Sequence, residues 1–259
     1  MFFDAYGDEA NPTLVLLHGA AALDTFANQY QALSRWFYVL VPHLPGAGEA
    51  AQEPYDPRQT CDALAAWIAT LKKGKVRLMG HSVGAELAVQ LVSRHEALFS
   101  RAVFLSPWLC ASPASVRLYV SMARMTYRSL KNAKLLRAQA KYWHFSEEQA
   151  ERLVGYSAKI PLETYLAFFE KRTALSDLPD YPGVSIPMLA MCARGDTGET
   201  KSSVRALGDQ NTNCLTVVFP QGSHDFVLRS SDLLNPMLLD FLTQDLPSSP
   251  ATQESARTE

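Results

Sequence analysis

Cysteine is scarce in this chain, and its few cysteines are not arranged as a redox or metal-binding pair. Four occur in 259 residues, and no two have CxxC spacing: Cys61, Cys110, Cys192 and Cys214. The N-terminus has an acid at Asp4 and no long apolar segment behind it, so it does not read as a secretory signal peptide. We therefore expect reduced, mostly buried thiols without a structural disulfide, and a cytoplasmic location.

Long hydrophobic runs and an excess of positive charge are also missing. The longest apolar runs, such as 13–17 and 76–79, are strand-sized, whereas a membrane helix needs roughly 20 apolar residues. The formal net charge is −2, and a nucleic-acid-binding domain is normally strongly basic. Clustered metal ligands, a phosphate-binding loop and a dinucleotide-binding glycine pattern are absent. We expect no membrane span, no nucleic-acid partner, no metal and no cofactor, but a small-molecule substrate.

Short aliphatic runs alternate with longer helical patterns along the chain. This alternation is typical of an α/β fold with a mostly parallel central sheet flanked by helices. The predicted strands are Phe2–Tyr6, Leu14–Leu17, Tyr38–Val41, Val76–Met79, Ala102–Leu105, Met188–Cys192 and Leu215–Phe219. The predicted helices are Thr25–Ser34, Pro57–Leu71, Val83–His95, Lys201–Leu207 and Ser231–Leu242.

The alternation stops over residues 107–180, which contain helical patterns, such as 115–141 and 146–156, but no convincing strand. We expect a helical cap there, inserted into a core made of residues 1–106 and 181–246. The last stretch, 247–259, is rich in Ser, Thr, Pro and Glu, and we expect it to be disordered. The cap carries seven positive charges with no acid between Val116 and Ser146: Arg117, Arg124, Arg128, Lys131, Lys134, Arg137 and Lys141. These charges indicate a solvated helix face or an anion-binding surface, and both interpretations stay open.

A candidate nucleophile follows the strand predicted at 76–79. The sequence there reads Gly80-His81-Ser82-Val83-Gly84, a G-x-S-x-G pattern between a strand and a helix. A serine on such a strained turn projects its hydroxyl away from the sheet, and small neighbours relieve the crowding. The positive end of the following helix also faces the point where negative charge develops during acyl transfer. The pattern therefore predicts Ser82 as a nucleophile.

From about Leu14 to Leu242 the chain resembles the α/β-hydrolase superfamily, in particular serine hydrolases of the esterase and lipase type with a helical lid. The residues that carry the resemblance are His18-Gly19, the segment 42–48, the segment 80–84, Asp196 and His224. The resemblance implies an eight-stranded sheet, of which seven strands are found, so we expect the first strand to be missing. It also implies the backbone N–H of Ala20 as an oxyanion-hole donor. Two positions depart from the usual pattern: His43 stands where an acid is common, and Ala50 where a serine is common.

A serine hydroxyl acts as a nucleophile with the help of a base, an acid that orients the base and two donors to the oxyanion, so we expect the sequence to supply these groups. The N–H of Val83, next to the nucleophile, should be the second oxyanion donor. Of six histidines, His224 alone lies in a loop between the last strand and the last helix, so we predict it as the base. Asp196 is the predicted acid because it follows a strand and precedes His224, in the chain order usual for this fold. Glu199 is the alternative acid, and His18 is expected to be structural.

These residues predict a hydrolase that forms an acyl-enzyme on Ser82 with a small to medium carboxylic ester, thioester or amide. Two alternatives stay open: carbon–carbon bond hydrolysis with the same triad, and a hydrolase-like receptor with little turnover. Halide and epoxide chemistry is disfavoured because the enzymes that perform it use an aspartate at the position of Ser82. The side chains predicted to bind substrate are Trp108, Met122, Trp143 and Phe168, from a wider apolar set that adds Tyr119, Met125, Tyr127, Phe145 and Phe169.

Overall fold

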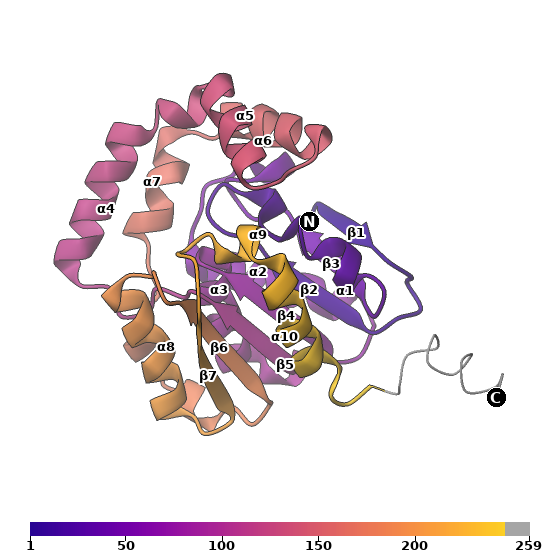
Figure 1. The fold of residues 1–259 in the computed structure, drawn as a ribbon. Helices are drawn as coiled ribbons and strands as arrows, with labels where there is room; N and C mark the ends of the chain where they lie inside the picture. The colour runs from indigo at the N-terminus through magenta and orange to yellow at the C-terminus, as the bar shows by residue number, and fades with distance from the viewer. Residues whose placement is uncertain (247–259) are drawn as a thin grey trace.

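A seven-stranded sheet forms the centre of the computed structural model, which describes residues 1–246 (Figure 1). The strands are β1 (Phe3–Tyr6), β2 (Thr13–Leu17), β3 (Tyr38–Pro42), β4 (Val76–His81), β5 (Phe99–Leu105), β6 (Met188–Ala193) and β7 (Cys214–Phe219). Their order in the sheet is β1-β3-β2-β4-β5-β6-β7; β1 runs antiparallel to β3, and the other neighbours are parallel. This confirms the predicted fold class. The predicted disordered tail, 247–259, lies outside the described residues.

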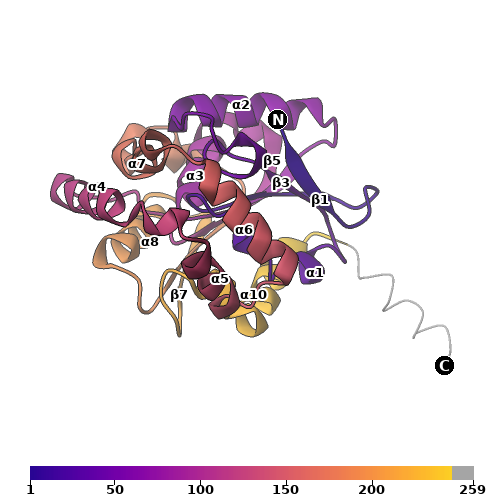
Figure 2. The same ribbon diagram turned by 90° about the horizontal axis from the view of Figure 1, so that it is seen from above.

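Helices cover both faces of the sheet, so the central strands are buried on both sides. Leu14 and Leu16 of β2 belong to one core cluster, while Val15 and Leu17 belong to the other. The first cluster packs under α1 (Tyr30–Leu33), α9 (Phe226–Arg229) and α10 (Ser231–Thr243); the second packs under α2 (Pro57–Thr70), α3 (Val83–His95) and α8 (Gly198–Gln210). Figure 2 shows α2 and α10 on opposite sides of the sheet.

Four helices between β5 and β6 lie together beyond the sheet (Figure 1). They are α4 (Pro113–Thr126), α5 (Ala133–Tyr142), α6 (Glu147–Lys159) and α7 (Leu162–Glu170). The side chains of Ser112, Asn132 and Ser146 accept hydrogen bonds from the first-turn N–H groups of α4, α5 and α6. These caps satisfy donors that have no partner inside the helix. We call the segment 107–180 the cap segment.

Several predicted helix boundaries were wrong. The helix expected at 25–34 is two short pieces, because Asn28 and Gln29 donate side-chain hydrogen bonds to the carbonyls of Leu228 and Val227 instead of facing solvent. The pattern at 115–141 is also divided, with Asn132 starting a new helix. The short helices α7 and α9 were not predicted, and both bury aromatic residues, Phe168 in α7 and Phe226 in α9.

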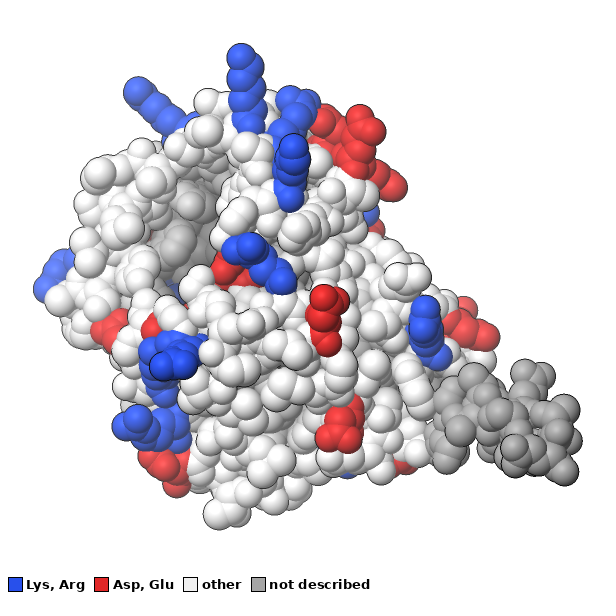
Figure 3. All heavy atoms as spheres, in the orientation of Figure 1, with Lys and Arg blue, Asp and Glu red and all other residues white. Residues whose placement is uncertain are grey.

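The structure bears on three features that the composition raised: the cysteines, the apolar runs and the cationic residues of the cap. All four cysteines are free thiols, and three of them are buried. Among residues 1–246, no helix combines the length and the apolar character that a membrane crossing requires. Two of the cationic cap residues have structural partners: Arg137 pairs with Glu151 at 2.6 Å, and Lys131 donates to carbonyls at the end of α6, including that of Ser157 at 2.8 Å. Figure 3 shows Lys and Arg side chains along the upper edge of the cap segment.

Candidate active site

Ser82 lies on the tight turn that joins β4 to α3. Its backbone has φ +56° and ψ −121°, a strained conformation for a residue with a side chain. The Ser82 N–H donates to the carbonyl of Leu105 at 2.9 Å, which holds the turn against β5. The flanking glycines are required by space: a Cβ at Gly80 would lie 2.2 Å from the Gly84 carbonyl oxygen, and one at Gly84 would lie 2.0 Å from that of Leu17. The sequence therefore folds here into a strained bend that presents a hydroxyl.

The imidazole of His224 lies between this hydroxyl and a carboxylate. His224 Nε2 is 2.9 Å from Ser82 Oγ, and its Nδ1 is 3.1 Å from Asp196 Oδ1. With the proton on Nδ1 donated to Asp196, Nε2 is free to accept the Ser82 O–H. The three residues are far apart in the chain but follow β4, β6 and β7, and the carboxyl ends of parallel strands meet at one edge of the sheet.

Asp196 is held as an anion by three hydrogen bonds. Besides His224 at Oδ1, its Oδ2 accepts from Ser106 Oγ at 2.6 Å and from the Ala193 N–H at 2.8 Å. The side chain is 1 % exposed. Burial by itself raises the pKa of this carboxyl, but the hydrogen bonds from His224 and Ser106 outweigh it, and the pKa lies below its usual range. Ser106, just past β5, was not identified from the sequence; its position after a central strand was the only signal.

Glu199, the alternative acid, is occupied elsewhere. Its carboxylate accepts hydrogen bonds from Trp108 Nε1 at 2.7 Å, Ser115 Oγ at 2.7 Å and the Ser112 N–H at 3.0 Å. Desolvation raises the pKa of Glu199, but these bonds outweigh it and lower the pKa to about 2. Glu199 therefore ties α8 to the start of the cap segment, and the geometry places Asp196 behind His224.

Two buried histidines position the loops around the site. His81 Nε2 donates to the backbone carbonyl of His224 at 2.9 Å, and burial lowers the pKa of His81 to about 3. His18 Nδ1 donates to the Gly19 carbonyl at 2.8 Å, while its Nε2 accepts from the Leu44 N–H at 3.2 Å. Burial also lowers the pKa of His18 to about 4. Both rings are neutral at pH 7 and act through backbone contacts, as expected for His18.

The loop after β2 brings a second backbone donor beside Ser82. Thr25 Oγ1 accepts from the Gly19 N–H at 3.0 Å and donates to the Ala22 carbonyl at 2.6 Å, which closes the loop on itself. Ala20 and Val83 line the same cavity as Ser82. Within residues 1–246, the Ala20 N–H donates to no protein group, and the first N–H groups of a helix such as α3 have no intrahelical acceptor. The loop at Ala20 and the start of α3 thus both reach the cavity that contains Ser82.

The cavity next to Ser82 has a volume of about 300 Å³. Aromatic rings form much of its wall, and one cation lines it: its residues include Trp108, Tyr119, Phe169, Arg172 and Thr200. Figure 3 shows the molecule hollowed between α4 and the part formed by α5 and α6, with mostly uncharged atoms inside. The arrangement suits a small or medium molecule with an apolar body.

Only one of the four side chains predicted to bind substrate lines the cavity next to Ser82. Trp108 lines the cavity beside Ser82, and Trp143 lines a second cavity of about 250 Å³ on the other side of Ala20. Among the described residues, Met122 and Phe168 line neither cavity. Met122 is 47 % exposed, and Phe168 is buried over Gly46 and against Tyr55, with ring centroids 4.8 Å apart. The next residue, Phe169, takes the wall position.

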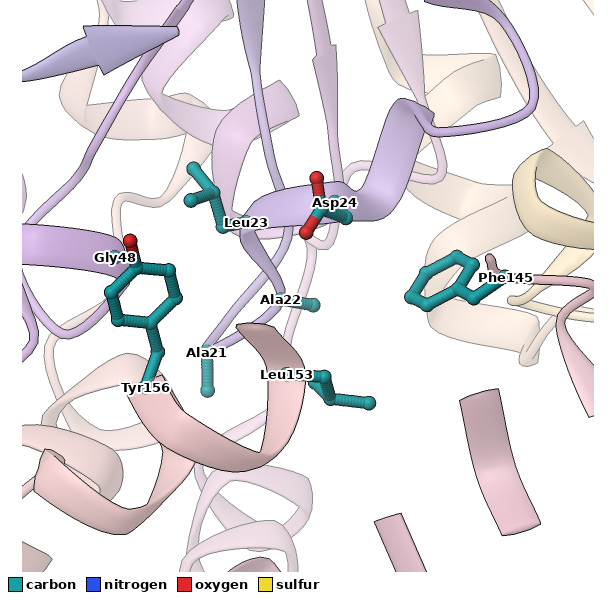
Figure 4. A pocket seen from close by; sticks show the side chains of 8 residues that line it. All are labelled: Ala21, Ala22, Leu23, Asp24, Gly48, Phe145, Leu153 and Tyr156. Carbon is teal, nitrogen blue, oxygen red and sulfur yellow. The ribbon is translucent and has the colours of Figure 1, made fainter. Parts of the chain in front are cut away.

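The cap segment packs directly on the loop after β2. Figure 4 shows Leu153 and Tyr156 of α6 and Phe145 around Ala21, Ala22 and Asp24. The space between them is only about 10 Å³, room for no more than a water molecule. Arg152 of α6 pairs with Asp24 at 3.3 Å and also with Asp4. This contact therefore fixes α6 and does not form a ligand site.

Fold and site together define an α/β hydrolase. The sequence pattern described as "Alpha/beta hydrolase family" matches residues 14–235, so the chain belongs to this family. It is similar to RutD of Stutzerimonas stutzeri (strain A1501), named as a candidate carbamate hydrolase, with 24 % identity over 90 % of this chain and 92 % of that protein.

Solved structures share the fold at low sequence identity. The enol-lactonase from Burkholderia xenovorans LB400 superposes with a TM-score of 0.76 and 24 % identity, covering 94 % of this chain and 96 % of that one. A thermophilic esterase from Thermogutta terrifontis superposes with a TM-score of 0.72 and 20 % identity, covering 94 % and 93 %. These similarities show a shared fold, and they do not show the substrate of this protein.

Proposed function

We propose that this protein is a serine hydrolase that cleaves a small to medium carboxylic ester, thioester or amide through an acyl-enzyme on Ser82. The observation that carries the proposal is the position of the His224 imidazole, 2.9 Å from Ser82 Oγ and 3.1 Å from Asp196 Oδ1. A serine hydroxyl becomes a useful nucleophile when a neighbouring base accepts its proton, and the two distances support this role for His224.

The reaction follows from these groups. His224 Nε2 takes the proton of Ser82 as Oγ attacks the carbonyl carbon, and the N–H groups of Ala20 and Val83 stabilise the oxyanion. The imidazolium, stabilised by Asp196, then gives the proton to the leaving alcohol, thiol or amine. Water enters, loses a proton to His224 and attacks the acyl carbon, and Ser82 recovers its proton as the acid departs. The complete cycle of acylation and deacylation returns Ser82 and His224 to their starting protonation states.

The cavity and the relatives support attack on an acyl group. The wall formed by Trp108, Tyr119 and Phe169 suits an apolar acyl or alcohol portion, and the second cavity, beyond Ala20, offers room for the other half of an ester. We place the lid function in residues 107–180, which form one side of both cavities. The relatives are named for carbamate, enol-lactone and ester hydrolysis, and each name describes attack at a carbonyl carbon bonded to oxygen or nitrogen.

A fluorophosphonate probe and a panel of p-nitrophenyl esters of increasing chain length test the proposal. We expect labelling of Ser82 and turnover of short to medium esters, and Ser82→Ala should abolish both. Labelling without turnover of any ester, thioester or amide would favour carbon–carbon hydrolysis or a receptor role and would contradict the proposal. Absence of labelling in the folded protein would contradict an activated serine altogether.

A further inference from the structure

Arg172 brings a buried positive charge into the wall of the cavity that contains Ser82. It follows α7, its side chain is only 9 % exposed, and it lines the cavity together with Ser82 and His224. The guanidinium lies over the ring of Trp108, 4.0 Å from the centroid. No lysine and no second arginine is among the lining residues. Asp196 also lines this cavity, but its carboxylate pairs with His224 and not with Arg172. A permanent cation in this wall needs a physical reason, because burying a charge is costly.

The protein satisfies this guanidinium only in part. Arg172 Nη2 donates to Glu86 Oε1 and to the Trp108 carbonyl, while Nη1 has a long contact of 3.5 Å with the Phe168 carbonyl. Nε is buried and has no hydrogen-bond partner within the described residues. A guanidinium has five N–H donors in one plane. Nη1, with a single long contact, therefore retains donor capacity for a ligand, whereas Nε is enclosed by protein.

Helix α3 connects the ion-pair partner of Arg172 to the turn that carries Ser82. This partner, Glu86, lies four residues after Ser82, and the Glu86 N–H donates to the Ser82 carbonyl at 3.1 Å. Four residues of an α-helix rise about 6 Å along its axis, and Ser82 is the non-helical residue directly before α3. An oxygen bound by Arg172 would therefore be separated from the scissile carbonyl by roughly two to four carbon atoms.

We infer that Arg172 recognises a carboxylate on the acyl portion of the substrate, so that the preferred substrates are short acyl esters that carry a second, anionic oxygen group. The inference rests on the proposed function, whose acyl-enzyme it makes more specific. Planar guanidinium donors match a carboxylate in geometry and charge, and the faces of Trp108 and Phe169 would contact the carbon spacer.

Glu86 tunes this recognition. Its side chain is 5 % exposed and already neutralises part of the Arg172 charge. Desolvation, only partly offset by Arg172, raises the pKa of Glu86 to about 7. Glu86 can thus take up a proton when an incoming carboxylate competes for the same guanidinium. Removing the negative charge of Glu86 should therefore strengthen binding of an anionic substrate.

Three matched methyl esters test the inference: monomethyl glutarate, methyl pentanoate, in which a methyl group replaces the carboxylate, and methyl 5-oxohexanoate, in which a neutral ketone replaces it. We expect kcat/KM for monomethyl glutarate to exceed that for methyl pentanoate by about 10- to 100-fold, the range for a hydrogen bond between buried charges. Arg172→Met should reduce this ratio by a similar factor, whereas Glu86→Gln should raise it. If the ion pair had only a structural role, Arg172→Met and Glu86→Gln would not change this ratio of kcat/KM values in opposite directions.

Controls separate folding, charge and failure of the proposed function. Lys171→Met removes the same charge from a half-exposed neighbour that pairs with Asp56, and it should leave the ratio unchanged. If Arg172→Met does not fold because Glu86 is left unpaired, the double variant Glu86→Gln/Arg172→Met avoids the buried charge and should also lose the preference.

The kinetic outcomes distinguish failure of the carboxylate inference from failure of the proposed function. Equal turnover of the glutarate and pentanoate esters would overturn the inference alone, and a preference for the ketone would overturn the assignment to a carboxylate. If no ester reacts although Ser82 is labelled, the proposed function fails. In that case glutarate and pentanoate are compared as inhibitors of the labelling of Ser82. Stronger inhibition by glutarate would support recognition of a carboxylate by Arg172, and equal inhibition would contradict it.

Discussion

The hydroxyl of Ser106 lies 2.6 Å from Asp196 Oδ2, the carboxylate oxygen that His224 does not contact. Ser106 directly follows β5, the strand between the one that leads to Ser82 and the one that leads to Asp196. Its φ of +47° is strained for a residue with a side chain, and its N–H donates to the Met191 carbonyl at 2.7 Å. Local strain at Ser106 thus places a hydroxyl against the Asp196 carboxylate, and we expect Ser106 to be a positioning residue for the proposed acid.

Removing the Ser106 hydroxyl should lower kcat more than it changes KM. We expect about a tenfold loss of kcat in Ser106→Ala, because one hydrogen bond to a charged group contributes roughly 1.5–3 kcal/mol. Ser106→Gly removes the same hydroxyl but relieves the positive φ, so an equal loss in both variants would assign the effect to the hydroxyl and not to strain. Ser100→Ala on the same strand, where Oγ has only a 3.4 Å contact, is the control. A loss confined to Ser106→Ala would contradict the positioning role.

The two acids that follow β6 should behave oppositely on substitution. Asp196→Asn replaces the acceptor of His224 Nδ1 and favours the wrong imidazole tautomer, and a comparable change in another serine hydrolase lowers kcat on the order of 10⁴-fold. Glu199→Gln should lower kcat less than tenfold but weaken the cap segment, because it disturbs the hydrogen bonds of Trp108 and Ser115. Kinetics combined with proteolysis of residues 107–180 distinguish the two outcomes. A larger kcat loss in Glu199→Gln would reverse the assignment of the acid.

The strands and the nucleophile turn could be predicted from the sequence because their signals are local. A buried parallel strand is a short apolar run, and the bend at Ser82 requires Gly80 and Gly84 on steric grounds. Asp196 and His224 followed from chain order in a fold whose strand ends converge. The seven-strand count also held within the described residues, with the antiparallel β1 at the edge.

The residues that were missed depend on tertiary contacts. Arg172 and Glu86 are 86 positions apart, and nothing near either one predicts their pairing. The predicted apolar set contains both Phe168 and Phe169, and the sequence alone does not say which of them faces the cavity. One step along a helix turns a side chain by about 100°. The buried Phe168 and the cavity-lining Phe169 differ by that rotation alone.

The two buried histidines should each contribute a loss of stability as the pH drops below about 6.5, because both are held neutral. Glu86, whose pKa burial raises to about 7, contributes in the opposite direction. Burial lowers the pKa of His18 to about 4 and of His81 to about 3, whereas both start from 6.5 when unfolded. Between these values the unfolded chain binds more protons, so the free energy of unfolding decreases as pH falls, by at most about 1.4 kcal/mol per histidine per pH unit. We expect His81→Gln, which keeps an amide donor toward the His224 carbonyl, to reduce this pH dependence.

Urea unfolding at pH 7.5, 6 and 5 measures the effect. His95→Gln is the matched control, since the His95 side chain is about one-third exposed, and it should retain the slope of the wild-type protein. Equal slopes for wild type and His81→Gln would contradict a neutral buried ring at position 81.

Two glycines in helices should respond in opposite directions to alanine. At Gly84 an added Cβ would lie 2.0 Å from the Leu17 carbonyl oxygen, so either β2 or the start of α3 must move. We expect Gly84→Ala to destabilise the fold by about 1–3 kcal/mol, as overpacking does, and to lower kcat by shifting Val83 and the loop at Ala20. Gly155 in α6 has no neighbour within 4 Å of an added Cβ, so Gly155→Ala should stabilise by about 0.5–1 kcal/mol through helix propensity. Chemical denaturation and ester kinetics on both variants check this. Full activity in Gly84→Ala would mean that the close approach of α3 to β2 is not what places the oxyanion donors.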